Sequence, residues 1–395
     1  MAKIAILERK CTGCGVCAGS CPFGAIDMKD GKPELNAACK VCGVCVRACP
    51  EKAILRLETK TATVDKSQWH DILVFAEASG GRLHPVSLEL IGKGLELAKN
   101  VNYQVKAVLV GHGVSAYAEE LRHYGVSEVA VYDDPELGYF RADAYAACVE
   151  DYIKYAKPSV VLVGATSLGR SLAPRLSTRF HTGLTADCTK LELRENTDLV
   201  QIRPAFGGNI MAQIITTNTR PQFATVRYKV MNAPARNEEA AGTVLTRRLP
   251  KRVAECKASC VSLTPIPPKK SISDAEVLVV GGRGLQKEAD LEMIKELASL
   301  LGGDWATTRP LVEKGWNTND RQIGLSGRTV RPRLIITCGV SGAIQFTACM
   351  NGSDHIIAIN TDRNAPIFDV AHVAIVGDLY EIVPALIKQL KEARA

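Results

Sequence analysis

The chain has 395 residues, which is enough for two or three domains with hydrophobic cores of their own. Hydrophobic residues make up 46% of it and charged residues 23%, which excludes a disordered protein, and no apolar run is long enough to span a bilayer. The net charge of +7 is spread along the chain and does not indicate nucleic-acid binding. Fourteen cysteines without a secretory signal predict a reducing compartment, the cytoplasm.

Eight of the cysteines form two motifs with the same spacing in the first fifty residues. The first motif is Cys11, Cys14, Cys17 and Cys21 followed by Pro22, and the second is Cys39, Cys42, Cys45 and Cys49 followed by Pro50. This is the spacing of bacterial two-cluster ferredoxins, in which the fourth cysteine of each motif binds the cluster of the other motif. The sequence therefore predicts two [4Fe–4S] clusters, one held by Cys11, Cys14, Cys17 and Cys49 and the other by Cys39, Cys42, Cys45 and Cys21.

Two other uses of these cysteines are disfavoured. A disulfide framework would need an oxidising compartment, and the first ten residues are too short and too polar for a secretory signal. Structural zinc sites also use pairs of cysteines two residues apart, but they do not need the third cysteine or the fourth before proline.

The first domain is predicted to span residues 1–66 and to be a small ferredoxin-like unit. Each motif ends in a similar tail, Cys21–Ile26 and Cys49–Ile54, so the unit is predicted to have a pseudo-twofold axis. A domain of this size has little apolar core and needs its clusters for stability. The polar stretch 60–68 that follows is a candidate hinge.

The second domain is predicted to span residues 67–263. It begins with an apolar strand at 72–76, and a helix follows with Leu88, Ile91, Leu95 and Ala98 on one face. Further strands are expected at 107–110, 129–132 and 160–163. Apolar strands that alternate with amphipathic helices predict a parallel sheet covered on both faces. Shorter strands at 213–217 and 224–227 predict an antiparallel extension of that sheet.

A proline-rich linker is predicted at 264–270, followed by a third domain at 271–395. Its strands are expected at 277–280, 334–337, 356–359 and 373–376, with helices at 287–301 and 381–391. These elements predict a second doubly wound parallel-sheet domain, of the kind that binds nucleotides at the carboxyl ends of its strands. The predicted fold class is thus α/β, with two doubly wound domains preceded by the ferredoxin-like domain.

Two glycine clusters follow strands of the third domain, Gly281–Gly284 and Gly339–Gln345. Backbone amides at a helix start with Arg283 nearby would suit a pyrophosphate. Neither cluster is a complete dinucleotide fingerprint or a Walker loop, so tight turns that serve only packing stay an alternative for both. Thr307–Pro310 and Gln322–Gly327 add hydroxyls, an amide and a guanidinium between the two clusters.

These segments together resemble the alpha subunit of electron-transfer flavoproteins. The resemblance extends through Ile357–Asn360, Ala365–Phe368 and Gly377–Leu379, and in the second domain through Gly164–Arg170, Thr182–Cys188 and Arg203–Asn209. It covers the chain from about Ile72 to the C-terminus. The ferredoxin-like domain resembles an addition found in some anaerobe members, including those that serve caffeyl-CoA reductase and lactate dehydrogenase.

The resemblance implies one FAD in the third domain, held beside a beta subunit. It places Arg309 near the isoalloxazine ring, Ser326 near its N5 edge, and Gln322, Thr308, Ser341, Gln345, Asn360 and Asp378 along the rest of the cofactor. The full set of expected cofactor-binding residues is Arg283, Thr308, Arg309, Gln322, Gly324, Ser326, Gly327, Ser341, Gly342, Ala343, Gln345, Asn360, Asp378 and Leu379. The chain departs from the family at Phe346, where histidine is frequent, and at Leu325, where glutamine is common.

The remaining cysteines are expected to have structural roles. Cys148, Cys188, Cys338 and Cys349 are predicted to pack in the interior, and Cys256 and Cys260 to be free thiols.

The leading functional hypothesis is an electron-transfer subunit of an oxidoreductase complex and not a self-sufficient enzyme. Paired with a beta subunit, it would pass electrons between NADH, ferredoxin and a partner flavin dehydrogenase such as an acyl-CoA (caffeyl-CoA) reductase, by flavin-based electron bifurcation. A non-bifurcating carrier for a lactate dehydrogenase-type partner is an alternative. A cluster-bearing sensor of nucleotides and a ferredoxin-dependent enzyme with its own substrate pocket are two others.

Overall fold

The computed structural model describes residues 2–58, 64–79, 81–205, 210–264 and 270–393. Contacts divide the chain into two units, Met1–Val64 and Asp65–Ala395. Three features named above lie partly outside the described residues: the candidate hinge 60–68 at 60–63, the Arg203–Asn209 segment at 206–209 and the linker 264–270 at 265–269. None of the helices in the described ranges is long and apolar enough to cross a membrane.

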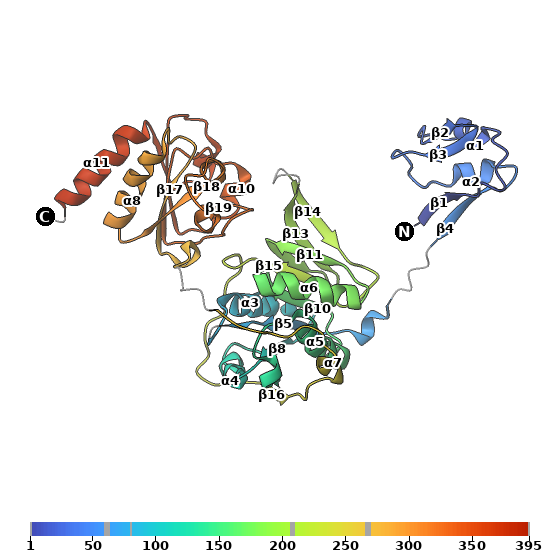
Figure 1. Ribbon diagram of the computed structural model, residues 1–395, viewed down its shortest axis with the longest axis horizontal. Helices are drawn as coiled ribbons and strands as arrows, with labels where there is room; N and C mark the ends of the chain where they lie inside the picture. The colour runs from blue at the N-terminus through green and yellow to red at the C-terminus, as the bar shows by residue number, and fades with distance from the viewer. Residues whose placement is uncertain (1, 59–63, 80, 206–209, 265–269, 394–395) are drawn as a thin grey trace. The chain divides into compact units, whose positions relative to one another are not determined.

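The first unit is built as a repeat, as its sequence predicts (Figure 1, blue). Strand β1 (Ala2–Ile6) pairs antiparallel with β4 (Ile54–Glu58), and β2 (Ile26–Lys29) pairs antiparallel with β3 (Lys32–Leu35). Two short helices, α1 (Val16–Gly19) and α2 (Val44–Ala48), each follow the first two cysteines of a motif and contain the third. The core of buried residues consists of Cys17, Ile26, Cys45 and Ile54. Half of this small core is cysteine, so the stability of the unit depends on what the cysteines hold.

The second unit contains two sheet domains. The one nearer the N-terminus has a seven-stranded parallel sheet in the order β11-β15-β10-β5-β8-β9-β16. Its strands are β5 (Ile72–Ala76), β8 (Val105–Gly111), β9 (Glu128–Asp133), β10 (Val160–Gly164), β11 (Leu184–Cys188), β15 (Gln222–Val226) and β16 (Thr243–Thr246). Its helices are α3 (Pro85–Lys99), α4 (Ser115–Arg122), α5 (Ala142–Ala156), α6 (Ser167–Arg179) and α7 (Lys251–Ala254). Strands β6 (Ala78–Ser79) and β7 (Arg82–Leu83) form a small hairpin between β5 and α3.

Alternate residues of β5 belong to the two hydrophobic cores of this sheet. Ile72 and Val74 pack in one core with residues of α3 and α4, and Leu73 and Phe75 pack in the other with residues of α5 and α6. A parallel strand covered on both faces needs this continuous apolar sequence, which is why its prediction from the sequence is confirmed.

The predicted antiparallel extension is wrong in its position. Strands β12 (Lys190–Leu193), β13 (Leu199–Ala205) and β14 (Ile210–Ile215) form a separate antiparallel sheet of three strands. The segment predicted at 224–227 belongs to β15, which lies within the main sheet, parallel to both β10 and β11. All five residues of β15 are buried. A strand that is buried on both faces lies inside a parallel sheet. Strand β15 therefore belongs to the main sheet, although in the sequence it comes directly after the three antiparallel strands.

The domain of this unit nearer the C-terminus has a six-stranded parallel sheet in the order β19-β18-β17-β20-β21-β22. Its strands are β17 (Val277–Gly281), β18 (Asp304–Thr308), β19 (Gln322–Ile323), β20 (Leu334–Cys338), β21 (His355–Asn360) and β22 (Val373–Val376). Its helices are α8 (Leu291–Leu300), α9 (Arg309–Glu313), α10 (Ile344–Thr347) and α11 (Leu379–Glu392). Numbered from β17, the order is 3-2-1-4-5-6, which is the order of dinucleotide-binding sheets. The strand order reverses between β17 and β20, so a ligand site is expected there.

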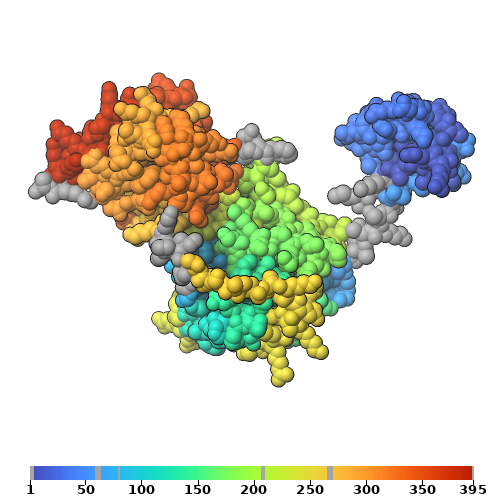
Figure 2. Space-filling model, in the orientation of Figure 1, coloured from blue at the N-terminus to red at the C-terminus, as the bar shows by residue number. Residues whose placement is uncertain are grey.

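Residues 256–264 leave α7 as an extended segment on the surface. Figure 2 shows this segment as a gold band over the domain of the seven-stranded sheet. Val261 and Leu263 in this band are 95% and 66% exposed. Both side chains of this segment therefore lie on the surface and add nothing to a hydrophobic core.

Candidate functional site

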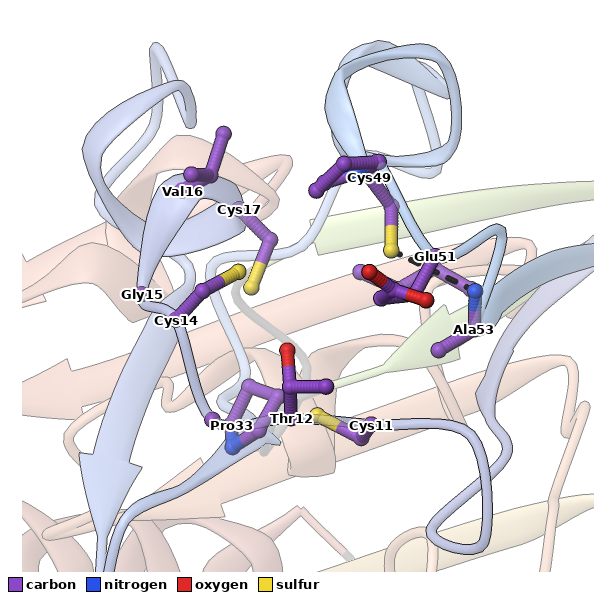
Figure 3. Close-up of a pocket in the computed structure, with 13 residues that line it drawn as sticks. Cys11, Thr12, Cys14, Gly15, Val16, Cys17, Pro33, Cys49, Glu51 and Ala53 are labelled. Carbon is purple, nitrogen blue, oxygen red and sulfur yellow. Dashed lines mark hydrogen bonds between the residues drawn. The ribbon is translucent and has the colours of Figure 1, made fainter.

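The first four cysteines predicted to share a cluster do line one pocket. Cys11, Cys14, Cys17 and Cys49 surround it together with Thr12, Pro33 and Glu51, and we call it the first cluster pocket. Figure 3 shows the sulfur atoms of these cysteines turned toward a common space. Cys49 arrives from the end of α2, in the other motif, because the repeat folds back on itself.

The second set of four cysteines lines a second pocket of the same kind. Cys39, Cys42, Cys45 and Cys21 surround it with Phe23 and Lys40, and we call it the second cluster pocket. The fourth cysteine again comes from the opposite motif. The two pockets thus bring together the two crossed sets that the spacing predicts.

The backbone around the pockets is arranged for metal clusters. Gly15 and Gly43 precede α1 and α2 in the left-handed conformation, with φ of 72° and 79°. The Ala25 amide donates to the Cys21 sulfur and the Ala53 amide to the Cys49 sulfur, both at 3.3 Å. Amide donors favour thiolate over thiol, so they fit a cysteine that binds iron.

The electrostatics of the free thiols also bear on this fit. Burial raises the pKa of the Cys17 and Cys45 thiols. Cluster binding therefore has to displace a proton from each. Among the described residues, no three His, Cys, Asp or Glu side chains lie close enough to hold a single metal ion. Four thiolates on one zinc ion would each lie about 2.3 Å from it, and the described side chains form no such group, whereas the two sets of four cysteines match the ligand sets of [4Fe–4S] clusters.

A larger pocket lies at the carboxyl end of the six-stranded sheet. Its cavity volume is about 600 Å³, which falls within the range of roughly 300–1,000 Å³ for small-molecule and cofactor sites. Nine of the expected FAD-binding residues line it: Arg283, Thr308, Arg309, Gln322, Gly324, Ser326, Ser341, Ala343 and Gln345. We call it the nucleotide pocket.

The polar groups of this pocket come from the ends of four neighbouring strands, β17, β18, β19 and β20, and from the loops that follow them. Gln322 is buried, and its side-chain amide donates to the Ser326 hydroxyl at 2.8 Å. Arg309 Nε donates to Glu313 Oε1 at 2.8 Å, although the Arg309 side chain stays 66% exposed. A flavin ring needs hydrogen-bonding partners and its pyrophosphate needs cations, and the donor set here meets both needs.

Five expected FAD-binding residues lie outside the nucleotide pocket. Asn360 ends β21 and donates from Nδ2 to the Val340 carbonyl at 2.8 Å, while the Asp378 carboxylate caps α11 by accepting from the Tyr380 amide at 2.9 Å. Leu379 is buried in the core. The remaining two, Gly327 and Gly342, have local packing roles. Asn360 at the end of β21 and Asp378 after β22 still lie at the carboxyl ends of their strands, the same edge of the sheet as the pocket.

The two glycine clusters meet at the point where the strand order reverses. The Gly282 amide donates to the Cys338 carbonyl and the Gly284 amide to the Gly339 carbonyl, both at 2.9 Å. A Cβ on Gly282 would lie 2.4 Å from the Gly339 carbonyl oxygen. Packing of one loop on the other therefore explains the glycines themselves, and Arg283 between them lines the nucleotide pocket.

The structure adds pocket residues that were not among the expected cofactor-binding residues. Pro310, Glu313, Ile323 and Val340 also line the nucleotide pocket. Glu313 was detectable as the residue four positions after Arg309 in a short helix, where side chains of opposite charge meet. Phe346 is 5% exposed and packs in the core as well as lining the pocket, so this position offers a cofactor an apolar wall.

The structural cysteines behave as predicted. Cys148, Cys188, Cys338 and Cys349 are buried, and burial raises the pKa of Cys148, Cys188 and Cys338 to about 12. Thiols of such high pKa are unreactive. Cys256 is half-buried and Cys260 is exposed, and neither forms a disulfide.

Comparisons with known proteins match each part of the chain. Residues 72–251 match the electron transfer flavoprotein domain, residues 271–351 the electron transfer flavoprotein FAD-binding domain, and residues 10–54 the 4Fe-4S dicluster domain. The lactate dehydrogenase (NAD(+),ferredoxin) subunit LctC of Acetobacterium woodii is 51% identical over 94% of this chain and 89% of its own length. The electron transfer flavoprotein subunit alpha of Clostridium acetobutylicum is 44% identical over 84% of this chain and 99% of its own. Protein FixB of Azorhizobium caulinodans is 42% identical over 80% and 87%.

Proposed function

The chain belongs to the electron transfer flavoprotein alpha-subunit family, and from this premise we propose that it carries electrons within an NAD- and ferredoxin-linked dehydrogenase complex. Its cofactors are FAD and two [4Fe–4S] clusters. The observation that carries the proposal is the presence, in one chain, of two four-cysteine pockets and a nucleotide pocket with two arginines. Clusters move single electrons and FAD, when bound, exchanges one or two, so a chain with both can connect donors of each kind.

Each cofactor is assigned its own residues in this proposal. Cys11, Cys14, Cys17 and Cys49 hold one cluster, and Cys39, Cys42, Cys45 and Cys21 hold the other. The residues of the nucleotide pocket would hold FAD, with Arg309 and Ser326 serving its flavin ring, and Asn360 and Asp378 would serve the rest of the cofactor from the same edge of the sheet. Arg283 and Arg309 supply the positive charge there, and Phe346 and Leu325 keep water from one wall.

The partners proposed are a beta subunit, which forms a heterodimer with this chain, a flavin dehydrogenase, and external ferredoxin. Two kinds of dehydrogenase were predicted from the sequence. The identity with LctC supports the lactate dehydrogenase type. The caffeyl-CoA reductase type has no comparable observation behind it and stays a prediction, and we therefore propose a 2-hydroxy acid dehydrogenase as partner.

We propose further that the complex bifurcates electrons, so that two NADH supply two electrons to ferredoxin and two to pyruvate. The complex of this chain, its beta subunit and its dehydrogenase is expected to oxidise NADH rapidly only when pyruvate and oxidised ferredoxin are both present. NADH absorbance at each combination of acceptors is the measurement. Equal rates with pyruvate alone would establish a non-bifurcating carrier, and turnover by this chain without partners would contradict the proposed role altogether.

Replacement of Arg309 by methionine tests the flavin environment. The variant is expected to retain FAD, because the side chain is largely exposed and pairs with Glu313 alone among the contacts described for it. Loss of this cation should make the flavin harder to reduce by about 1 kcal/mol, the energy of two unit charges about 4 Å apart in water. Spectroelectrochemical titration of the flavin measures this change.

A matched control is Lys314→Met, which removes a neighbouring cation that stacks on Trp316 and does not line the pocket. It should leave the flavin potential unchanged. Glu313→Gln should shift the potential in the direction opposite to Arg309→Met. A potential that does not respond to Arg309→Met would remove this residue from the flavin environment.

A further inference from the structure

The two cluster pockets can be compared position by position because the module is a repeat. Cys11 corresponds to Cys39, and every following residue of the first repeat has its counterpart 28 positions later, as far as Met28 and Arg56 in strands β2 and β4. The two pockets are therefore an internal control for one another. Any difference between them must come from the positions where the repeat is broken.

Two features that set the reduction potential of a cluster, solvent exposure and hydrogen bonds to the sulfur atoms, are the same in the two pockets. The buried ligands Cys17 and Cys45 are 6% and 7% exposed, and the amide-to-sulfur hydrogen bonds to Cys21 and Cys49 are both 3.3 Å long. The remaining ligands fall into equal classes of exposure, with Cys14 and Cys42 both exposed. Burial and hydrogen bonding thus give the two clusters nearly the same environment.

Charge is not matched, and two positions of the repeat differ in the same direction. Thr12 lines the first cluster pocket where its counterpart Lys40 lines the second, and Glu51 lines the first where its counterpart Phe23 lines the second. Figure 3 shows the Glu51 carboxylate and the Thr12 hydroxyl beside the cysteine sulfurs. Among the described residues, the charged side chain lining the first pocket is a carboxylate and the one lining the second is an ammonium.

A third position adds to this difference. The Arg56 Nη1 atom lies 3.8 Å from where a Cβ on Gly43 would stand, and Gly43 lines the second cluster pocket. The counterpart of Arg56 is Met28, and the equivalent position on Gly15 has no heavy atom within 4 Å. Lys10 precedes Cys11 in the chain, but it does not line the first cluster pocket.

Reduction places an additional negative charge on a cluster. A carboxylate beside the cluster opposes that charge, and an ammonium or guanidinium favours it. Glu51 and Lys40 are both exposed, so water and salt screen part of the effect. The part of the electrostatic effect that is not screened has the same direction at all three positions: each difference makes the cluster of the second pocket easier to reduce than the cluster of the first.

We propose that the two clusters have unequal reduction potentials, with the cluster of the second pocket reduced first and the cluster of the first pocket reduced last. An electron that enters the module then settles on the cluster held by Cys39, Cys42, Cys45 and Cys21. This inference rests on the cluster ligands assigned in the proposed function.

The test uses the full-length chain, purified anaerobically and titrated with dithionite while the reduced clusters are followed by low-temperature electron paramagnetic resonance. The native protein should show two separate one-electron steps. Glu51→Gln should raise the lower potential and leave the higher one in place, and Lys40→Gln should lower the higher potential and leave the lower one in place. The expected change in the ratio of reduced to oxidised cluster is about threefold at a fixed potential. This change corresponds to a shift of about 30 mV in the reduction potential, because a tenfold change in the ratio corresponds to about 59 mV for a one-electron couple.

Glu34→Gln is the matched control, since Glu34 is an exposed carboxylate of the same module that pairs with Lys29 and lines neither pocket. It should move neither potential by a comparable amount. About eight irons per chain in every variant would show that the clusters are held as proposed. With that count intact, a single potential in the native protein, or a Glu51→Gln shift in the higher potential, would overturn the inference. A missing cluster would instead contradict the ligand assignment.

Discussion

A chain in which both Cys11 and Cys49 are replaced by alanine is expected to keep about four irons, whereas replacement of both Cys39 and Cys49 should leave almost none. The reason is the crossed arrangement of the pockets. Cys11 and Cys49 line the first cluster pocket together, but Cys39 lines the second. The first pair of substitutions therefore removes ligands from one cluster, and the second pair removes a ligand from each. Iron and acid-labile sulfide counted on anaerobically purified protein measure the outcome.

Ligation of each cluster by its own motif would reverse this pattern. The chain without Cys39 and Cys49 would then keep about four irons, and the chain without Cys11 and Cys49 would lose both clusters. The control is the replacement of Cys256 and Cys260 by alanine, which also removes two thiols but from a segment outside both pockets. That chain should keep all of its iron.

Gly342→Ala is expected to abolish FAD binding and to lower the stability of the FAD-binding domain by about 2–4 kcal/mol. Gly342 has φ of 86°, and a Cβ there would lie 2.1 Å from the Ile367 backbone nitrogen. Because the obstacle is backbone and not a flexible side chain, the loop itself must move. Its neighbours Ser341 and Ala343 line the nucleotide pocket and would move with it.

Gly315→Ala separates the effect of the backbone conformation from the effect of the contact. Gly315 has φ of 78°, but no heavy atom lies within 4 Å of the position of a Cβ. This variant should lose only about 1 kcal/mol, the cost of the left-handed conformation for a residue with a Cβ, and should keep its FAD. Denaturant unfolding followed by the fluorescence of Trp305 and Trp316, both in this domain, gives the stabilities, and flavin absorbance gives the FAD content. Equal behaviour of the two variants would show that the Ser341–Ala343 loop does not support the cofactor.

The cluster module was the part of the fold most open to prediction. Its ligands are set by covalent spacing, because thiolates two residues apart can reach one cluster only from a tight loop. The residues of that loop are present in the sequence as glycines and prolines. The two crossed cysteine sets predicted from spacing are the sets that line the two pockets.

The sheets were predicted where strands are apolar on both faces and missed where they are not. The strand at 72–76 has only buried residues and was evident in the sequence. Strands β18 and β19 were not predicted as strands, because they carry Thr307, Thr308 and Gln322 toward the nucleotide pocket region and lack a continuous apolar run. Polar residues that serve a ligand site at the end of a strand interrupt its apolar run, and such a strand is then not predicted from the sequence pattern.

By itself, the sequence determined that the chain has clusters, because their ligands are one residue type at fixed separations along the chain. It indicated the FAD-binding domain through segments that resemble the alpha subunit of electron-transfer flavoproteins. Tertiary structure alone decided the order of the strands, which places the two glycine clusters against each other at the reversal point of the six-stranded sheet. It also decided which charges line which cluster, since Glu51 and Lys40 act through distance in space and electrostatic energy falls with that distance, not with separation in sequence.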